Sequence, residues 1–219
     1  MSRPFIILGA GGHARSVVGS LLRAGLPVLG LSDSEPARQG GRVLGFPVLG
    51  DDDTVLNHQP AEIYLALGIG HVGQAAPRRA LMERFMALGY EFPPVVDPTA
   101  VLGHEAALGA GSQILASATV QAGCVLGVGA IVNTGAVVDH DCRIGDHAHI
   151  ATGAILAGAV DVGSASLIGC GAVLRQCICV GIGAVVGAGA VVVADVANGA
   201  WVVGTPARPM RTKDRESVA

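Results

Sequence analysis

Charged and aromatic residues are scarce in this chain of 219 residues: 14% are Asp, Glu, Lys or Arg, and 3% are Phe, Trp or Tyr. The 14 basic residues are outnumbered by 17 acidic ones, and no basic run stands out. Nucleic acids are bound through their phosphates by clustered Lys and Arg. The composition therefore argues against a nucleic-acid partner.

Paired cysteines and a membrane-spanning segment are also lacking. The five cysteines contain no Cys-x-x-Cys spacing, and their odd number disfavours a closed disulfide framework. The apolar stretch at residues 4–9 is too short to span a membrane, and no signal-type cleavage region accompanies it. We therefore expect a soluble cytoplasmic protein with reduced thiols and no membrane insertion.

Small and aliphatic residues dominate instead: 51% of the chain is hydrophobic, and 33 residues are glycine. From Val96 to Val192 every sixth residue is aliphatic, and a second column of small residues such as Ala100 and Cys124 lies four positions later. Helices repeat every 3.6 residues and simple strands every 2, so neither produces this pattern. A strict period of six predicts a hexapeptide solenoid, in which each rung is a short strand followed by a corner.

The first ninety residues have a different pattern. Apolar segments at 4–9, 26–33 and 61–68 predict strands. Two helices are predicted, one ending at residue 25 and the other at residue 89. The first has Val17, Leu21 and Leu22 on one face. Alternating strands and helices predict a small parallel α/β domain that resembles half of a Rossmann fold. Prolines at 93, 94 and 98 set the boundary. The expected units are the α/β domain at 1–92, the solenoid at 93–196 and a tail at 197–219.

The turn after the first predicted strand, GAGGHA, approximates the G-x-G-x-x-G fingerprint, with Ala14 in the third glycine position. Backbone N–H groups at such a turn, with the helix N-terminus that follows, can hold a phosphate. Asp33, at the end of the second strand, suits a ribose hydroxyl or a base N–H. The domain is too short for a complete dinucleotide fold, so a nucleotide sugar is favoured over NAD, although a purely structural turn also explains the motif. The candidate nucleotide-sugar residues are Gly9, Gly11, Gly12, His13, Asp33 and Gly68.

Three histidines lie within residues 137–150, VVDHDCRIGDHAHI. His140, His147 and His149 fall outside both inward columns, so their side chains should point away from the core of the solenoid. Asp141 follows His140, and a neighbouring carboxylate can fix the tautomer of an imidazole and raise its basicity. His140 is therefore a candidate base. His147 and the isolated His71 are expected to lie at the surface.

Three segments, ILGAGGHARSVV, NTGAVVDHDCRIGDHAHIATGA and VVGTPAR, together with the hexads, make the chain resemble the nucleotide-aminosugar N-acetyltransferases. The resemblance implies a left-handed parallel β-helix and a homotrimer with active sites in the grooves between neighbouring helices. It implies acetyl-CoA as co-substrate and no metal. On this sequence the family's general base corresponds to His140 and its orienting acid to Asp141. The expected acetyl-CoA contacts are His149, Gly158, through its backbone N–H, and Asn133, and Trp201 or Arg208 could contact the adenine or phosphates of CoA.

The expected reaction is direct transfer of acetyl from acetyl-CoA to the C4 amino group of a nucleotide-linked 4-amino-4,6-dideoxy sugar, of the GDP-perosamine or UDP-bacillosamine-precursor type. A single acid at Asp33, where many relatives have two, leaves the nucleotide open. An O-acetyltransferase acting on a sugar or sialic acid hydroxyl would use the same base, and a non-catalytic nucleotide-sensing trimer would not need His140. Zinc carbonic anhydrases of this fold use two histidines separated by four residues, a pair that is absent here.

Overall fold

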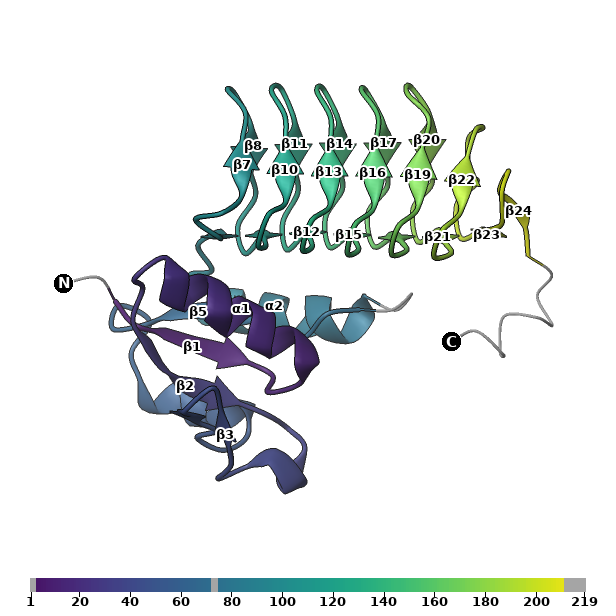
Figure 1. Cartoon of the computed structure of the whole chain (residues 1–219). Coiled ribbons are helices and arrows are strands. Elements are labelled where there is room, and N and C mark those ends of the chain that lie inside the picture. Colours follow the sequence, from purple (N-terminus) through teal and green to yellow (C-terminus); the bar gives the residue numbers. More distant parts are fainter. Residues whose placement is uncertain (1–2, 72–74, 211–219) are drawn as a thin grey trace.

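The structure is a computed structural model that describes residues 3–71 and 75–210. An N-terminal α/β domain lies beside a long β-helix whose coils are stacked in a row (Figure 1). Both architectures agree with the sequence-based expectation. No helix within the described residues is long and apolar enough to cross a membrane.

The N-terminal domain is built on a three-stranded parallel sheet with the order β2-β1-β5. The strands are β1 (Phe5–Leu8), β2 (Val28–Ser32) and β5 (Tyr64–Leu67), and the helices are α1 (Gly12–Arg23) and α2 (Ala76–Ala87). Alternate residues of β1 belong to different clusters: Phe5 and Ile7 pack with α1, whereas Ile6 and Leu8 pack with α2. The strand is therefore buried on both faces, which explains its continuous apolar run.

Two details of this domain differ from the expectation. In α1 the buried face contains Val17, Val18 and Leu21, whereas Leu22 is 47% exposed. The side chain of Leu22 is rotated by about 100° from that of Leu21 around the helix axis, which takes it off the sheet. Short elements between β2 and β5 were not expected, because two or three residues carry no periodicity. They are η1 (Pro36–Arg38), β3 (Arg42–Val43), β4 (Phe46–Pro47) and η2 (Asp52–Asn57).

From β6 to β22 the β-helix consists of two-residue strands that pair in parallel every 18 residues, as Val137 does with Ile155. Its aliphatic and small columns form one continuous core. Sheet I contains β6 (Val95–Val96), β9 (Gln113–Ile114), β12 (Ile131–Val132), β15 (His149–Ile150), β18 (Leu167–Ile168), β21 (Val185–Val186), β23 (Trp201–Val203) and β24 (Arg208–Pro209). Sheet II contains β7 (Val101–Leu102), β10 (Thr119–Val120), β13 (Val137–Val138), β16 (Ile155–Leu156), β19 (Val173–Leu174) and β22 (Val191–Val192). Sheet III contains β8 (Ala107–Leu108), β11 (Val125–Leu126), β14 (Arg143–Ile144), β17 (Asp161–Val162) and β20 (Cys179–Val180).

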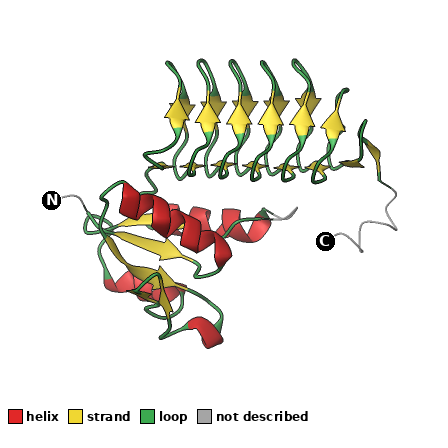
Figure 2. Cartoon of the chain, viewed as in Figure 1, coloured by secondary structure: helices red, strands yellow, loops and turns green. Residues whose placement is uncertain are grey.

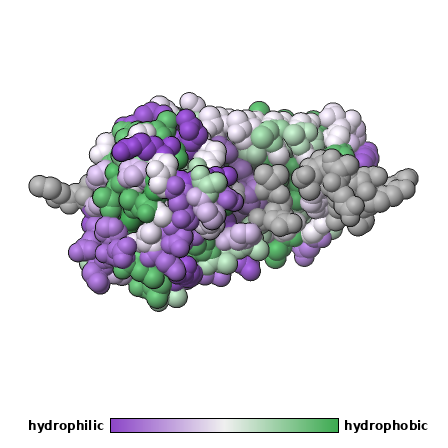
Figure 3. Space-filling model, turned by 90° about the horizontal axis from the view of Figure 1, so that it is seen from below, coloured by the Kyte–Doolittle hydropathy of each residue, from purple (hydrophilic) through white to green (hydrophobic). Residues whose placement is uncertain are grey.

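The N-terminal domain lies against sheet I, whereas the corners that join sheet II to sheet III lie at the opposite edge of the molecule (Figures 1 and 2). Seen from below, strongly hydrophilic residues are concentrated over the N-terminal domain, and the β-helix side of this face is paler (Figure 3). Asp97, just after β6, links the two units because its buried carboxylate accepts hydrogen bonds from Ser20 and Arg23 of α1. Burial alone would raise the pKa of Asp97, but the hydrogen bonds from Arg23, Ser20 and Thr99 outweigh it and hold that pKa well below its usual range.

Candidate active site

The first candidate site is a cavity of about 300 Å³ in the N-terminal domain. The structure brings all six residues of the expected nucleotide-sugar site to its wall, together with Ser34, Arg38, Asp52, Ile69 and Gly70. Gly9 has a φ of +99°, and a side chain at Gly68 would collide with the Gly9 carbonyl oxygen, so both glycines permit a close backbone approach. Gly12 opens α1, whose N-terminal N–H groups favour an anion at this end.

Asp33 supports the turn from inside this cavity. Its Oδ2 accepts hydrogen bonds from the Ala10 amide at 2.7 Å and from Arg38 at 3.1 Å, and its Oδ1 accepts from the Glu35 amide at 2.9 Å. Burial would raise the pKa of Asp33, but the Glu35 and Ala10 amides and Arg38 outweigh it, so the pKa is lowered and the group is a carboxylate. Both oxygens are therefore already hydrogen-bonded within the protein, and Arg38 and Asp52, which sequence reasoning did not select, also face the cavity.

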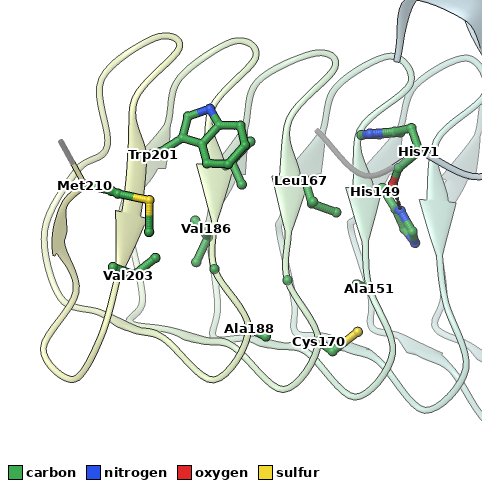
Figure 4. A pocket seen from close by; sticks show the side chains of 13 residues that line it. His71, His149, Ala151, Leu167, Cys170, Val186, Ala188, Trp201, Val203 and Met210 are labelled. Atoms are coloured by element: carbon green, nitrogen blue, oxygen red, sulfur yellow. Dashed lines mark hydrogen bonds between the residues drawn. The ribbon is translucent and has the colours of Figure 1, made fainter. Parts of the chain in front are cut away.

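The second candidate site is a groove of about 260 Å³ along sheet I, which runs from His71 and His149 to Trp201 and Met210 (Figure 4). Between these ends the groove is lined by small and aliphatic residues, which are Ala151, Leu167, Gly169, Cys170, Val185, Val186, Gly187, Ala188 and Val203. Ala151, Leu167 and Val185 form an apolar cluster against which Trp201 packs, whereas Val186 belongs to the core of the β-helix. The groove has the chemistry to hold an extended, largely apolar chain, with imidazoles at one end and an indole ring at the other.

His149 lies at the inner end of this groove and is only 8% exposed. Its Nδ1 donates a hydrogen bond to the His71 carbonyl oxygen at 2.9 Å, because a carbonyl can only accept. Its Nε2 therefore carries the lone pair and accepts from the Asn133 side-chain amide at 3.1 Å. Burial lowers the pKa of His149, with a further contribution from Arg78, so the imidazole is neutral. The structure thus joins His149 and Asn133, two of the expected acetyl-CoA contacts.

Two other histidines were expected at the surface and are buried. His71 is 4% exposed and His147 is 5% exposed, and His71 Nε2 donates to the His147 carbonyl oxygen at 2.9 Å. Burial is the main cause that lowers the pKa of His71 to about 4. For His147 the hexad pattern shows only that the residue points outward, and here the N-terminal domain covers the outward side. His71 lies before the hexads and is buried by its contact with this same part of the β-helix.

Arg78 of α2 lies in the same interface and has no exposed surface. Its guanidinium donates to the carbonyl oxygens of Ile69 and Gly129, and therefore joins the end of the N-terminal sheet to a corner of the β-helix. Burial lowers the pKa of Arg78 to about 9, so it remains a cation at neutral pH. Nothing in the local pattern of α2 marks this residue, because its contacts come from distant parts of the chain.

His140 lies on the corner that joins β13 to β14, and it is exposed. Its Nδ1 is 2.8 Å from Asp141 Oδ2, and this hydrogen bond, together with nearby Asp139, raises the pKa of His140. Gly158 stands one coil further on, where a methyl group would lie 2.6 Å from both Cε1 and Nε2 of the imidazole. His140, Asp141 and Gly158 are therefore brought together, with Nε2 directed over the glycine.

The expected residues of the acetyl-transfer site form two groups that do not meet within one chain. The β13–β14 corner with His140 is opposite sheet I in the triangular coil, whereas His149 and Asn133 lie on and beside sheet I (Figure 1). No three His, Cys, Asp or Glu residues gather as a possible metal site in the part of the chain that the structure describes.

Comparison with known proteins identifies the family. Residues 4–85 match the PglD N-terminal domain family. The chain is 35% identical to PerB from Caulobacter crescentus, solved with CoA and GDP-perosamine, with 95% of this chain and 97% of that chain covered and a TM-score of 0.88. A variant of perosamine N-acetyltransferase from the same organism is 34% identical to this chain. The match covers 95% of this chain and 97% of that chain, with a TM-score of 0.88. The chain belongs to the nucleotide-aminosugar N-acetyltransferase family.

Two further solved structures support this family fold. The acetyltransferase domain of PglB from Neisseria gonorrhoeae, solved with acetyl coenzyme A, is 39% identical to this chain. The match covers 96% of this chain and 100% of that domain, with a TM-score of 0.88. WeeI from Acinetobacter baumannii shares the fold, with a TM-score of 0.66 and 22% identity. The match covers 95% of this chain and 100% of WeeI. No curated protein sequence matches the chain. The expected α/β domain followed by a left-handed β-helix is confirmed.

Proposed function

We propose that the protein transfers acetyl from acetyl-CoA to the C4 amino group of a nucleotide-linked 4-amino-4,6-dideoxy sugar. The observation that carries the proposal is that the polar cavity of the N-terminal domain and the apolar groove along sheet I are lined by consecutive residues of one segment, 68–71. Gly68, Ile69 and Gly70 line the polar cavity, and the next residue, His71, lines the apolar groove. Across this segment the rings of His13 and His149 are 6.5 Å apart.

The polar cavity suits the nucleotide sugar. Backbone amides at Gly11 and Gly12 and the N-terminus of α1 favour a diphosphate, and Arg38 adds a cation at the rim. The apolar groove suits the pantetheine arm of acetyl-CoA, whose thioester would lie at the His149 end and whose adenine would lie toward Trp201. GDP-perosamine is the first acceptor to test, since it is bound in the 35%-identical structure, and a UDP-linked 4-amino sugar is the second.

In the proposed mechanism His140 is the general base. Its Nδ1–H donates to Asp141, so Nε2 has the lone pair that can accept a proton. The sugar amine attacks the thioester carbonyl carbon, and the proton of the nitrogen passes to Nε2 as the C–N bond forms. Collapse of the tetrahedral intermediate breaks the C–S bond, and CoA leaves as the thiolate and takes up the proton as free thiol. The backbone amide of Gly158 is the proposed donor to the thioester oxygen.

A homotrimer is part of this proposal, because one chain holds His140 and His149 on opposite sides of the coil. A second copy whose sheet II–sheet III corner lay in the groove of the first would complete the site. The outward side of sheet II supports such packing, since Val101, Ile155 and Val173 are large exposed hydrophobic residues on one face. Mixing His140→Asn with His149→Ala subunits tests this, because only a shared site recovers activity in the mixture.

The activity is tested by following free CoA thiol from acetyl-CoA with GDP-perosamine, a UDP-linked 4-amino sugar and the matching 4-hydroxy sugars. Turnover with an amine acceptor supports N-acetylation, and turnover with only the alcohols would replace it by O-acetylation. His140→Asn should reduce kcat on the order of 10²-fold or more. Cys170 lines the groove, so Cys170→Ala distinguishes direct transfer, which it leaves intact, from an acyl-cysteine intermediate, which it abolishes.

A further inference from the structure

Gln113 of β9 is a buried amide on the outward side of sheet I, where its paired neighbours along the β-helix are Val95 and Ile131. It is 1% exposed. Its Nε2 is 2.7 Å from the Leu67 carbonyl oxygen, and its Oε1 is 2.7 Å from His13 Nε2. A buried amide is costly unless it is hydrogen-bonded, and here both ends of the amide have partners from the N-terminal domain.

These contacts determine which nitrogen of His13 carries the proton. The Leu67 carbonyl can only accept, so the amide nitrogen of Gln113 must face it and the amide oxygen must face His13. That oxygen also only accepts, so His13 Nε2 must donate. Burial, with a contribution from Arg78, lowers the pKa of His13 to about 4, and the imidazole is therefore neutral with a lone pair on Nδ1.

His13 lines the polar cavity, and because its Nε2 is bonded to Gln113, Nδ1 is the ring nitrogen that remains for a ligand there. A methyl group at Gly70, which lines that cavity, would lie 3.6 Å from Nδ1, and no described residue donates a hydrogen bond to this nitrogen. A neutral lone pair cannot bind a phosphate, whose oxygens are also acceptors. It can accept from a hydroxyl or an amino group, and the His13 ring lies only 6.5 Å from His149 at the acetyl groove.

We propose that Gln113 is a positioning residue that sets the tautomer of His13, so that Nδ1 accepts a hydrogen bond from a hydroxyl or amino group of the sugar. The proposal rests on the proposed function for the identity of the ligand. It assigns the phosphates to the backbone amides of the glycine turn and the sugar to His13. The acceptor end of the nucleotide sugar then points toward His149.

Two measurements test this proposal. Nitrogen NMR of the histidines, with His13 assigned by a His13→Asn variant, should show a neutral ring protonated at Nε2 at pH 7 in the wild-type protein. In Gln113→Leu that preference should be lost. Calorimetry should show GDP-perosamine binding weakened about tenfold in Gln113→Leu, with the affinity for GDP alone within twofold. Gln121→Leu, the same substitution at an exposed corner, should leave both affinities unchanged.

Protonation of His13 at Nδ1 in the wild-type protein would overturn the proposal without need of any variant. Equal weakening of GDP and GDP-perosamine in Gln113→Leu would also overturn it, because His13 would then serve the phosphates. A melting temperature for Gln113→Leu matched to that of the wild type ensures that the comparison concerns a folded protein. Absence of turnover with every amino sugar would instead remove the proposed function, while the NMR result would still decide the tautomer.

Discussion

Replacement of Gly158 by alanine isolates the geometry of His140. The added methyl group would lie 2.6 Å from Cε1 and Nε2 of the imidazole, whereas carbon atoms pack at about 3.5–4.0 Å. The ring must therefore shift by about 1 Å, and its 2.8 Å hydrogen bond to Asp141 must lengthen or break. A displacement of this size can reduce catalysis on the order of 10²-fold. Gly158 is not in the left-handed region of φ, so alanine suits its backbone and stability should change little.

The assay is steady-state release of CoA thiol with saturating acetyl-CoA and amino sugar, with thermal unfolding as the check on folding. Gln176→Ala, at the same corner one coil further on, is the matched control and should keep full kcat. In the double variant with His140→Asn, the alanine should cost nothing further, because both changes act through one imidazole.

The result also separates two roles for Gly158, because alanine keeps the backbone N–H that the proposed mechanism directs at the thioester oxygen. A kcat of Gly158→Ala within threefold of the wild type would refute the steric argument and leave the N–H as the sole contribution. An additional large loss in the double variant would show that Gly158 acts independently of His140.

Three further predictions follow from named contacts. Asp141→Asn should lower kcat and shift the acid limb of the pH–rate profile to lower pH, because Asp141 raises the pKa of His140, the proposed base, which must be neutral to act; an unshifted limb would contradict this. Asp97→Ala should reduce the free energy of unfolding by about 2–4 kcal/mol at pH 7 in urea titrations. Because the folded pKa of Asp97 is depressed, that difference should be present above about pH 4 and shrink as pH falls further, and a pH-independent loss would contradict the assignment. Ala151→Leu should fill the apolar groove and raise KM for acetyl-CoA while the affinity for the nucleotide stays unchanged; an equal effect on both ligands would place acetyl-CoA elsewhere.

Much of the fold could be predicted because its signals are local and regular. The six-residue period places Val138, Ile144 and Ile150 in the core, and they are buried. The strand-turn-helix at the N-terminus could be located by its glycines, and the six candidate residues of the expected nucleotide-sugar site line one cavity. The small hairpin between β2 and β5 escaped prediction because its strands are only two residues long.

The residues that the sequence did not reveal are those whose environment depends on the packing of the N-terminal domain against sheet I. His71, Arg78 and Gln113 are buried there and share hydrogen bonds across distant segments. A lone Gln on a two-residue strand or a lone Arg on a helix has no periodic signal that distinguishes it from a surface residue.

By itself, the sequence determined the two architectures, their order and the outward direction of His140 and His149, because each follows from periodicity along the chain. The tertiary structure decided what lies outside each of these histidines. His140 stands at an exposed corner, with a raised pKa beside Asp141, whereas His149 is covered by the N-terminal domain and has a lowered pKa. The physical reason is that burial and charge depend on contacts between residues far apart in the chain, which no local pattern records.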